Sequence, residues 1–140
     1  MISVIVPTFN AARTLRSTLE ILAPYRPRLI KEVLIADGGS SDGTAEIAAS
    51  LGCAVVRSRK GRGGQLRDGA FAAKQEWLLF LHADTCLSGD WANALVSFSG
   101  QVRFRQVAGV FSFGLDDDDL RARLLEHLVA LRVRLLALPY

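Results

Sequence analysis

Short apolar runs alternate with amphipathic stretches along most of the chain. Each run is rich in aliphatic or aromatic residues and ends at a proline, a turn-forming loop or a charged residue, which is typical of a buried strand. Such runs cover residues 3–7, 32–36, 53–58 and 77–81. The segments between and after them predict helices, one of which begins after Asn10 as its N-cap while the others cover residues 44–52, 65–74 and 90–98.

The last part of the chain predicts a fifth strand over residues 107–115, an acidic turn from Asp116 to Asp119, and an amphipathic helix from about Leu120 to Leu138. Leucines form a broad stripe on this helix, with arginines at the polar positions. We interpret the stripe as a face that packs against the sheet. Peripheral contact with a membrane and self-association are the alternatives, because basic amphipathic helices lie on lipid and uncovered apolar faces associate.

Strands that alternate with helices predict an α/β domain with a mostly parallel sheet, formed as a single domain by residues 1–140. Ligands of such sheets bind beyond the carboxyl ends of the strands. Polar groups follow the predicted strands at these ends, namely Thr8 and Asn10, Asp37, the segment from Arg59 to Gly64, and His82 with Asp84. Their positions predict one shared site at one edge of the sheet.

Composition narrows the class of protein only slightly. The chain has 140 residues, of which 50% are hydrophobic and 22% charged, so it can form a sizeable core. A net charge of +3 suits an anionic substrate such as a nucleotide, and it is too small to predict binding to nucleic acid. The two cysteines show no disulfide or zinc spacing. The N-terminus lacks a signal peptide, and no apolar run reaches the roughly 18 residues of a membrane span, so we predict a cytoplasmic protein.

Three polar segments are candidates for ligand binding. Asp37 ends a strand before two glycines, where its carboxylate could accept hydrogen bonds from a base or ribose, or cap the turn. Asp42 stands where the next helix begins, so we favour helix capping for it over ligand contact. The basic glycine loop at residues 59–64 suits a diphosphate, with a solvated basic loop as the alternative.

His82 and Asp84 form the fourth candidate. Residues two apart in a strand point to the same side, so both side chains could enter one site. A carboxylate at Asp84 could bind a divalent cation. His82 suits Mn²⁺ better than Mg²⁺, and it could instead donate a hydrogen bond to a phosphate or ribose.

The motifs "VIVPTFN", "VLIADGGSSDGT" and "LFLHADT" resemble, in this order, those of family-two glycosyltransferases, enzymes of the GT-A fold. The resemblance covers essentially the whole chain. "LHADT" and the ending "LRVRLLALPY" also resemble a bacterial subgroup of selenodomain-associated or arsenosugar-biosynthesis glycosyltransferases.

The resemblance implies a GT-A, Rossmann-like sandwich that transfers a sugar from a nucleotide-diphosphate sugar, usually linked to UDP, to an acceptor hydroxyl. It implies a nucleotide site in which Asp37 binds the base, at Pro7, Thr8, Asn10, Asp37, Asp42, Arg62 and Gly63. It further implies that Asp84, with His82 at the first position of the D-x-D motif, coordinates Mn²⁺ or Mg²⁺. Transfer would be inverting, with an acceptor activated by a carboxylate base and a metal ion that holds the departing nucleoside diphosphate.

Two features depart from the family pattern. His82 replaces the first aspartate of the D-x-D motif, and the chain ends at Tyr140, where the segment that carries the family's general base would begin. We therefore expect a C-terminally incomplete nucleotide-binding domain, with its catalytic base and its acceptor unassigned. A non-catalytic nucleotide-binding fragment is one alternative. A nucleotidyltransferase of GT-A-like fold is another, although "TFNAARTLR" stands where such enzymes carry a glycine-rich basic loop.

Overall fold

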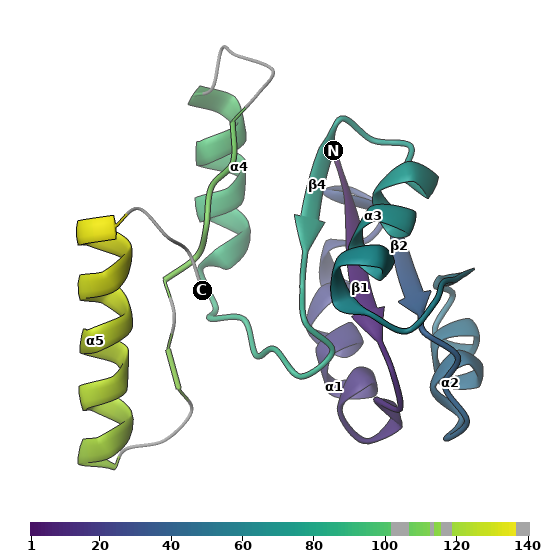
Figure 1. Cartoon of the computed structure of the whole chain (residues 1–140). Helices are drawn as coiled ribbons and strands as arrows, with labels where there is room; N and C mark the ends of the chain where they lie inside the picture. Colours follow the sequence, from purple (N-terminus) through teal and green to yellow (C-terminus); the bar gives the residue numbers. More distant parts are fainter. Residues whose placement is uncertain (102–106, 113, 116–118, 137–140) are drawn as a thin grey trace. The chain divides into compact units, whose positions relative to one another are not determined.

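The computed structural model describes residues 1–101, 107–112, 114–115 and 119–136. The chain divides into two compact units, Met1–Asn93 and Ala94–Tyr140 (Figure 1), and each is described by itself. The prediction that residues 1–140 form a single domain stays a prediction.

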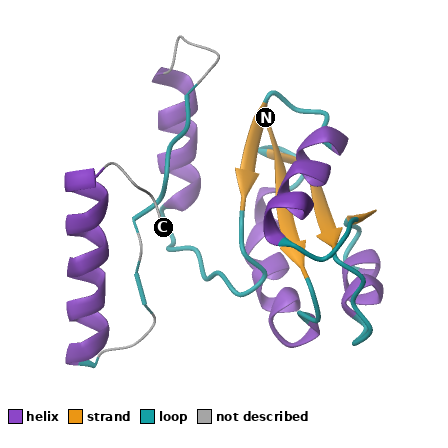
Figure 2. Ribbon diagram, viewed as in Figure 1, coloured by secondary structure: helices purple, strands orange, loops and turns teal. Residues whose placement is uncertain are grey.

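The first unit contains a four-stranded sheet in the order β3-β2-β1-β4. Figure 2 draws its strands in orange among the purple helices. Its strands are β1 (Ile2–Thr8), β2 (Ile30–Asp37), β3 (Ala54–Arg57) and β4 (Trp77–Phe80). All three pairings are parallel, with Thr8 opposite Asp37 and Asp37 opposite Arg57. The predicted α/β class with a parallel sheet is therefore confirmed, and the polar strand ends lie at one edge as expected.

Three helices connect these strands: α1 (Ala12–Leu22), α2 (Thr44–Ser50) and α3 (Arg62–Ala72). A short 3₁₀ helix, η1 (Ala23–Tyr25), follows α1 and contains Pro24. Helices α1 and α2 lead from β1 to β2 and from β2 to β3, on one side of β1. Helix α3 then leads back to β4, on the other side of β1. Right-handed crossovers then place α3 on the opposite face from α1 and α2, as Figure 1 shows.

The core lies between β1, β2 and these helices. Leu15, Leu19 and Leu22, the predicted apolar stripe of α1, are all buried. On the other face, α3 approaches β1 directly at Gly69, where an added Cβ would lie 2.5 Å from Cγ2 of Ile5. This close contact brings the start of α3 and the loop before it to the carboxyl end of β1.

Helix α4 (Trp91–Gln101) starts within the first unit, where the ring of Trp91 packs edge-on against Tyr25 at 4.8 Å between centroids.

The predicted fifth strand is wrong for the described part of residues 107–115, which forms no strand. Its valines favour a strand only if a neighbouring strand supplies hydrogen bonds. Instead, the Leu115 N–H donates to a side chain, Oε1 of Glu126, at 2.7 Å. The same carboxylate contacts Arg123, and the pKa of Glu126 is lowered by the Leu115 N–H and then by Arg123.

Helix α5 (Leu120–Leu136) confirms the predicted C-terminal helix as far as the description extends. Its first turn is capped by Asp119, whose carboxylate accepts the Arg121 N–H at 3.4 Å, while residues 116–118 of the predicted acidic turn lie outside the described residues. Ala122 is buried, whereas the leucines of the opposite side are exposed, namely Leu120, Leu124, Leu128 and Leu131. Packing of this helix on the sheet, contact with a membrane and self-association all stay predictions. In the described part of the chain, every helix is too short or too polar to span a membrane.

Candidate functional site

A pocket of about 440 Å³ opens in the first unit at the carboxyl ends of β1 and β4. Six of the predicted site residues line it, namely Pro7, Thr8, Asn10, Arg62, His82 and Asp84. Phe9, Lys60 and Gln65 line it as well, although no motif in the sequence predicts an individual role for them. The predicted site residues Asp37, Asp42 and Gly63 lie outside the lining.

Asp37 stands at the end of β2 with both carboxylate oxygens engaged. Oδ1 accepts the hydroxyls of Thr8 at 3.0 Å and Ser40 at 2.5 Å, and Oδ2 accepts the N–H groups of Gly39 at 3.0 Å and Ser40 at 2.9 Å. Burial alone raises the pKa of Asp37, but the hydrogen bonds from Ser40, Thr8 and Gly39 outweigh burial and lower it. Asp37 therefore caps the turn in this structure, and the direct contact with a base implied by the resemblance stays a prediction.

The loop after β2 is tied to the start of α1 by exchanged hydrogen bonds. Asn10 Oδ1 accepts the Ser41 N–H at 2.9 Å, and Asp42 Oδ2 accepts the Ala12 N–H at 3.0 Å. The predicted N-cap at Asn10 is wrong, because Asn10 has φ 52° and the first N–H groups of α1 bond to Thr44 and Asp42 instead. The hydroxyl of Thr44 and the Ala12 N–H lower the pKa of Asp42. Asp42 Oδ1 also accepts the Thr44 N–H at 3.1 Å, while the N-cap of α2 (Thr44–Ser50) is Gly43. Asp42 therefore bonds to N–H groups at the start of both helices without standing at the N-cap position of either.

The basic loop carries two cations to the pocket. The ammonium of Lys60 lies 3.9 Å from the ring centroid of Phe9, and Phe9 is 41% exposed. Arg62 is the first residue of α3, and its exposed guanidinium lines the pocket. A helix N-terminus with free N–H groups and a flexible cation is a favourable place for phosphate oxygens.

Gln65 connects this loop to the carboxyl ends of β1 and β2 through its side chain. It is 4% exposed, and its Nε2 donates to the carbonyl oxygens of Thr8 at 2.6 Å and Ala36 at 2.8 Å. Its Oε1 accepts the Gly61 N–H at 3.3 Å. The only local signal for this role in the sequence is a glutamine among the small residues of a helix that follows a glycine-rich loop.

His82 and Asp84 reach the pocket by a turn. β4 ends at Phe80, and residues 82–85 turn, with the Thr85 N–H donating to the His82 carbonyl at 3.2 Å. The argument from strand alternation is therefore wrong, although both side chains do line one pocket. The buried Thr18 on α1 holds this turn by donating its hydroxyl to the Ala83 carbonyl at 2.9 Å.

The donor set at this turn suits a divalent cation that takes further ligands from a bound anion. Neither the imidazole of His82 nor the carboxylate of Asp84 has a hydrogen bond or ion pair among the described residues, so both side chains are available. No group of three or more acidic, histidine or cysteine side chains that could hold a metal occurs in the described parts of the chain. One carboxylate and one imidazole fit Mn²⁺ when phosphate oxygens and water complete the shell.

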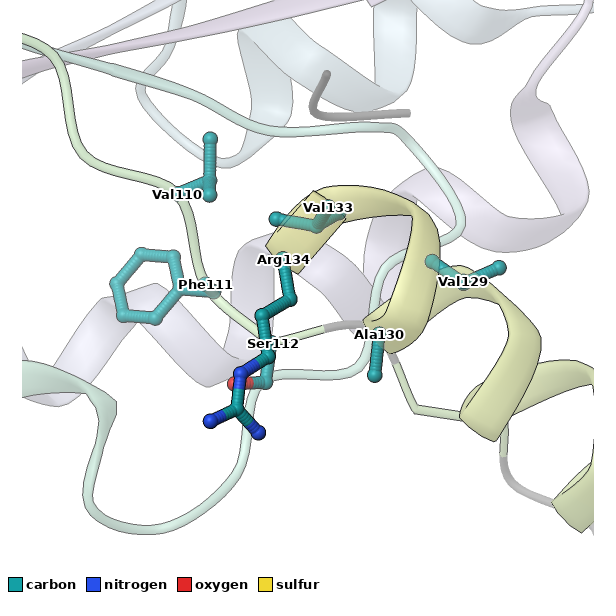
Figure 3. A pocket seen from close by; sticks show the side chains of 7 residues that line it. All are labelled: Val110, Phe111, Ser112, Val129, Ala130, Val133 and Arg134. Carbon is teal, nitrogen blue, oxygen red and sulfur yellow. The ribbon is translucent and has the colours of Figure 1, made fainter. Parts of the chain in front are cut away.

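A second pocket, of about 310 Å³, lies within the second unit between residues 110–112 and α5 (Figure 3). Val110, Phe111, Val129 and Val133 contribute apolar side chains, and Arg134 contributes a cation. None of the predicted site residues lines this pocket. The first pocket is therefore the candidate for chemistry.

Comparison with known proteins decides the family. The sequence model of Glycosyl transferase family 2 matches residues 3–137. The chain belongs to this family. Relatives include Glycosyltransferase AglJ of Haloferax volcanii, 37% identical over 68 residues, which are 48% of this chain and 22% of the relative. The PGL/p-HBAD biosynthesis glycosyltransferase of Mycobacterium bovis is 34% identical over 109 residues, which are 72% of this chain and 42% of the relative.

Solved structures that are similar to this chain extend the comparison. Glucosyl-3-phosphoglycerate synthase from Mycobacterium tuberculosis, in complex with Mn²⁺, UDP and glucosyl-3-phosphoglycerate, matches with a TM-score of 0.56 and 27% identity over 59% of this chain and 33% of that chain. The same enzyme has been solved with Mg²⁺ and UDP. These matches confirm the predicted GT-A fold. The chain spans less than half the length of each of these proteins.

Proposed function

We propose that the pocket at the ends of β1 and β4 binds a nucleoside-diphosphate sugar, and that the chain serves transfer of the sugar to an acceptor hydroxyl. One observation carries this proposal. The pocket places the unpaired carboxylate of Asp84 and the imidazole of His82 in one cavity with Lys60, Arg62 and the N-terminus of α3. Cation ligands and anion ligands around one cavity suit a diphosphate that is shared between a metal ion and basic groups.

The nucleoside would occupy the side of the pocket formed by residues 7–11. Phe9 offers an exposed aromatic ring there, and Pro7 and Thr8 form the neighbouring backbone. An aromatic face stacks on a base without selecting among bases. UDP is the favoured nucleotide because glucosyl-3-phosphoglycerate synthase, whose structure is similar, was solved with UDP.

The diphosphate would lie between the basic loop and the turn at residues 82–85. Lys60 and Arg62 would bind its oxygens and stabilise the negative charge that develops on the departing nucleoside diphosphate. Asp84, assisted by His82, would hold Mn²⁺ or Mg²⁺, and the bound ion would supply further neutralisation of that charge. Inversion at the anomeric carbon, attacked by an acceptor hydroxyl, is the proposed course of transfer, and no described side chain of the pocket is assigned as its base.

Calorimetric titration tests the donor site. We expect UDP to bind more tightly with Mn²⁺ than without it, and more tightly than GDP or ADP. Asp84→Ala should remove the Mn²⁺ dependence, whereas Asp90→Ala, a change of an exposed aspartate outside the pocket, should leave it intact. Absence of binding of all three nucleotides to a folded sample would contradict the proposal.

A non-catalytic nucleotide-binding role is the second candidate, because none of the described side chains that line the pocket is assigned as a catalytic base. Sugar transfer to simple acceptors, or hydrolysis of UDP-sugars that depends on Asp84, would establish catalysis by the chain. Nucleotide binding without either reaction would favour the non-catalytic role.

A further inference from the structure

Gln65 connects the basic loop to the ends of two strands. Its side chain is buried at the base of the pocket, and it bonds to Thr8 of β1, Ala36 of β2 and Gly61 of the loop. Both hydrogens of its amide nitrogen and one lone pair of its amide oxygen are used in this way. The orientation of the amide is therefore determined, because two carbonyl oxygens accept from the same atom.

The loop between β3 and α3 is held at both ends. At one end, the hydroxyl of Ser58 donates to Oδ2 of Asp68 on α3. At the other end, the Gly61 N–H donates to the side-chain Oε1 of Gln65, and the backbone N–H of Gln65 donates to the Gly61 carbonyl at 3.0 Å. The loop also packs against the turn after β2. A Cβ at Gly38 would lie 3.1 Å from Cα of Lys60 and 3.2 Å from Nε2 of Gln65. Gln65 thus fills the narrow space between this turn and the residues that precede Arg62.

From these contacts we infer that Gln65 is a positioning residue for the diphosphate, acting through the basic loop, an inference that rests on the proposed function. It holds Lys60, Arg62 and the free N–H groups at the start of α3 at a set distance from the ends of β1 and β2. Without it, the buried carbonyls of Thr8 and Ala36 lose a donor and the loop loses its anchor to the sheet. The affinity for phosphate groups should then fall, while the affinity for the nucleoside should remain.

A series of ligands with increasing phosphate number measures this effect. The affinities of uridine, UMP and UDP are compared in the presence of Mn²⁺ for the wild type, Gln65→Leu and Gln75→Leu. Gln75 is the matched control, because it lies at the opposite end of the sheet and its recorded bond, to the hydroxyl of Ser3, comes from its backbone N–H.

For Gln65→Leu we expect the gain in affinity from uridine to UDP to shrink about tenfold or more, which is the value of one hydrogen bond to a charged group. Uridine itself should bind within about twofold of wild type, since the Thr8 carbonyl on the nucleoside side keeps the Gly38 N–H as a donor at 2.9 Å. Gln75→Leu should keep the whole gain. A purely structural role would weaken uridine and UDP by the same factor, and that result would overturn the inference.

Gln65→Glu provides a second test, which does not depend on whether the Gln65→Leu variant folds. A protonated glutamate can still donate to one of the two carbonyl oxygens. An ionised glutamate has no hydrogen to donate, so its negative charge is repelled by both carbonyl oxygens. The ratio of variant to wild-type UDP affinity should therefore be nearest to one at low pH and should fall as pH rises. Taking the ratio at each pH cancels the ionisation of UDP itself. A ratio that does not change with pH would contradict the assigned bonds.

The two proposals fail in different ways. A wild-type chain that binds none of the three ligands refutes both of them. A wild-type chain that binds UDP, beside a Gln65→Leu variant with an undiminished phosphate gain, refutes the role of Gln65 alone.

Discussion

Replacement of Asp37 separates a turn-capping carboxylate from a base-binding one. In the structure the carboxylate receives four hydrogen bonds, from Thr8, Gly39 and twice from Ser40. Asp37→Ala removes all four, and the hydroxyl of Thr8, which is 2% exposed, loses its acceptor. Asp37→Asn keeps the shape, because its amide oxygen can accept the two N–H groups while its amide nitrogen donates to the two hydroxyls.

The magnitude follows from these bonds. An unpaired buried polar group costs about 1–3 kcal/mol, and a hydrogen bond to a charged group contributes about 1.5–3 kcal/mol. The N–H groups of Gly39 and Ser40 can be rehydrated, since both residues reach solvent, so their loss counts for less. We expect Asp37→Ala to lower the free energy of unfolding by about 3 kcal/mol and Asp37→Asn by less than about 1 kcal/mol.

Urea denaturation followed by circular dichroism measures the free energy of unfolding, and calorimetry with UDP and Mn²⁺ measures binding. Asp84→Ala is the opposite control, because its carboxylate has no partner in the described structure and should affect binding without affecting stability. The reasoning is refuted if Asp37→Ala keeps wild-type stability and still loses UDP. That result would show that Asp37 acts on the base.

Three further predictions concern packing, metal binding and pH. Gly69→Ala should lower the free energy of unfolding by about 1–3 kcal/mol in urea denaturation, because the new methyl group would press on Ile5, whereas Gly64→Ala meets nothing within 4 Å and should not destabilise. Thr18→Val should raise the Mn²⁺ concentration needed for half-maximal UDP binding, since it frees the turn that carries Asp84, and Thr18→Ser should restore the wild-type value. Hydrogen bonds outweigh burial and depress the folded-state pKa of Asp37, so its stabilisation is present above the ordinary aspartate pKa and is lost as pH falls through the depressed one. The free energy of unfolding should therefore fall more steeply with decreasing pH for wild type than for Asp37→Asn. Equal slopes would contradict this assignment.

The apolar pattern predicts the fold of the first unit well, because each buried strand corresponds to its own run of apolar residues in the sequence. The runs at 3–7, 32–36, 53–58 and 77–81 all fall on strands of the structure. Parallel topology then requires their carboxyl ends to meet, which is why the sequence predicts that Thr8, Arg62 and Asp84 share a site, as the pocket confirms.

What the pattern missed depends on contacts between distant segments. The N–H groups of Ala11 and Ala12 at the start of α1 bond to Thr44 and Asp42, thirty or more positions away, so local capping rules pointed to Asn10 instead. The role of Gln65 depends on the carbonyl oxygens of two strands that its own helix does not contain. The predicted strand is absent from the described part of residues 107–115 for a related reason, because residue preference cannot supply a pairing partner.

A crystal structure of this chain with UDP and Mn²⁺ tests the central claim most directly. The account predicts the diphosphate between Arg62 and Asp84, with the metal ion on the Asp84 carboxylate and the base beside Phe9. UDP bound elsewhere, such as in the apolar pocket against α5, or a metal ion with no contact to Asp84, would contradict it.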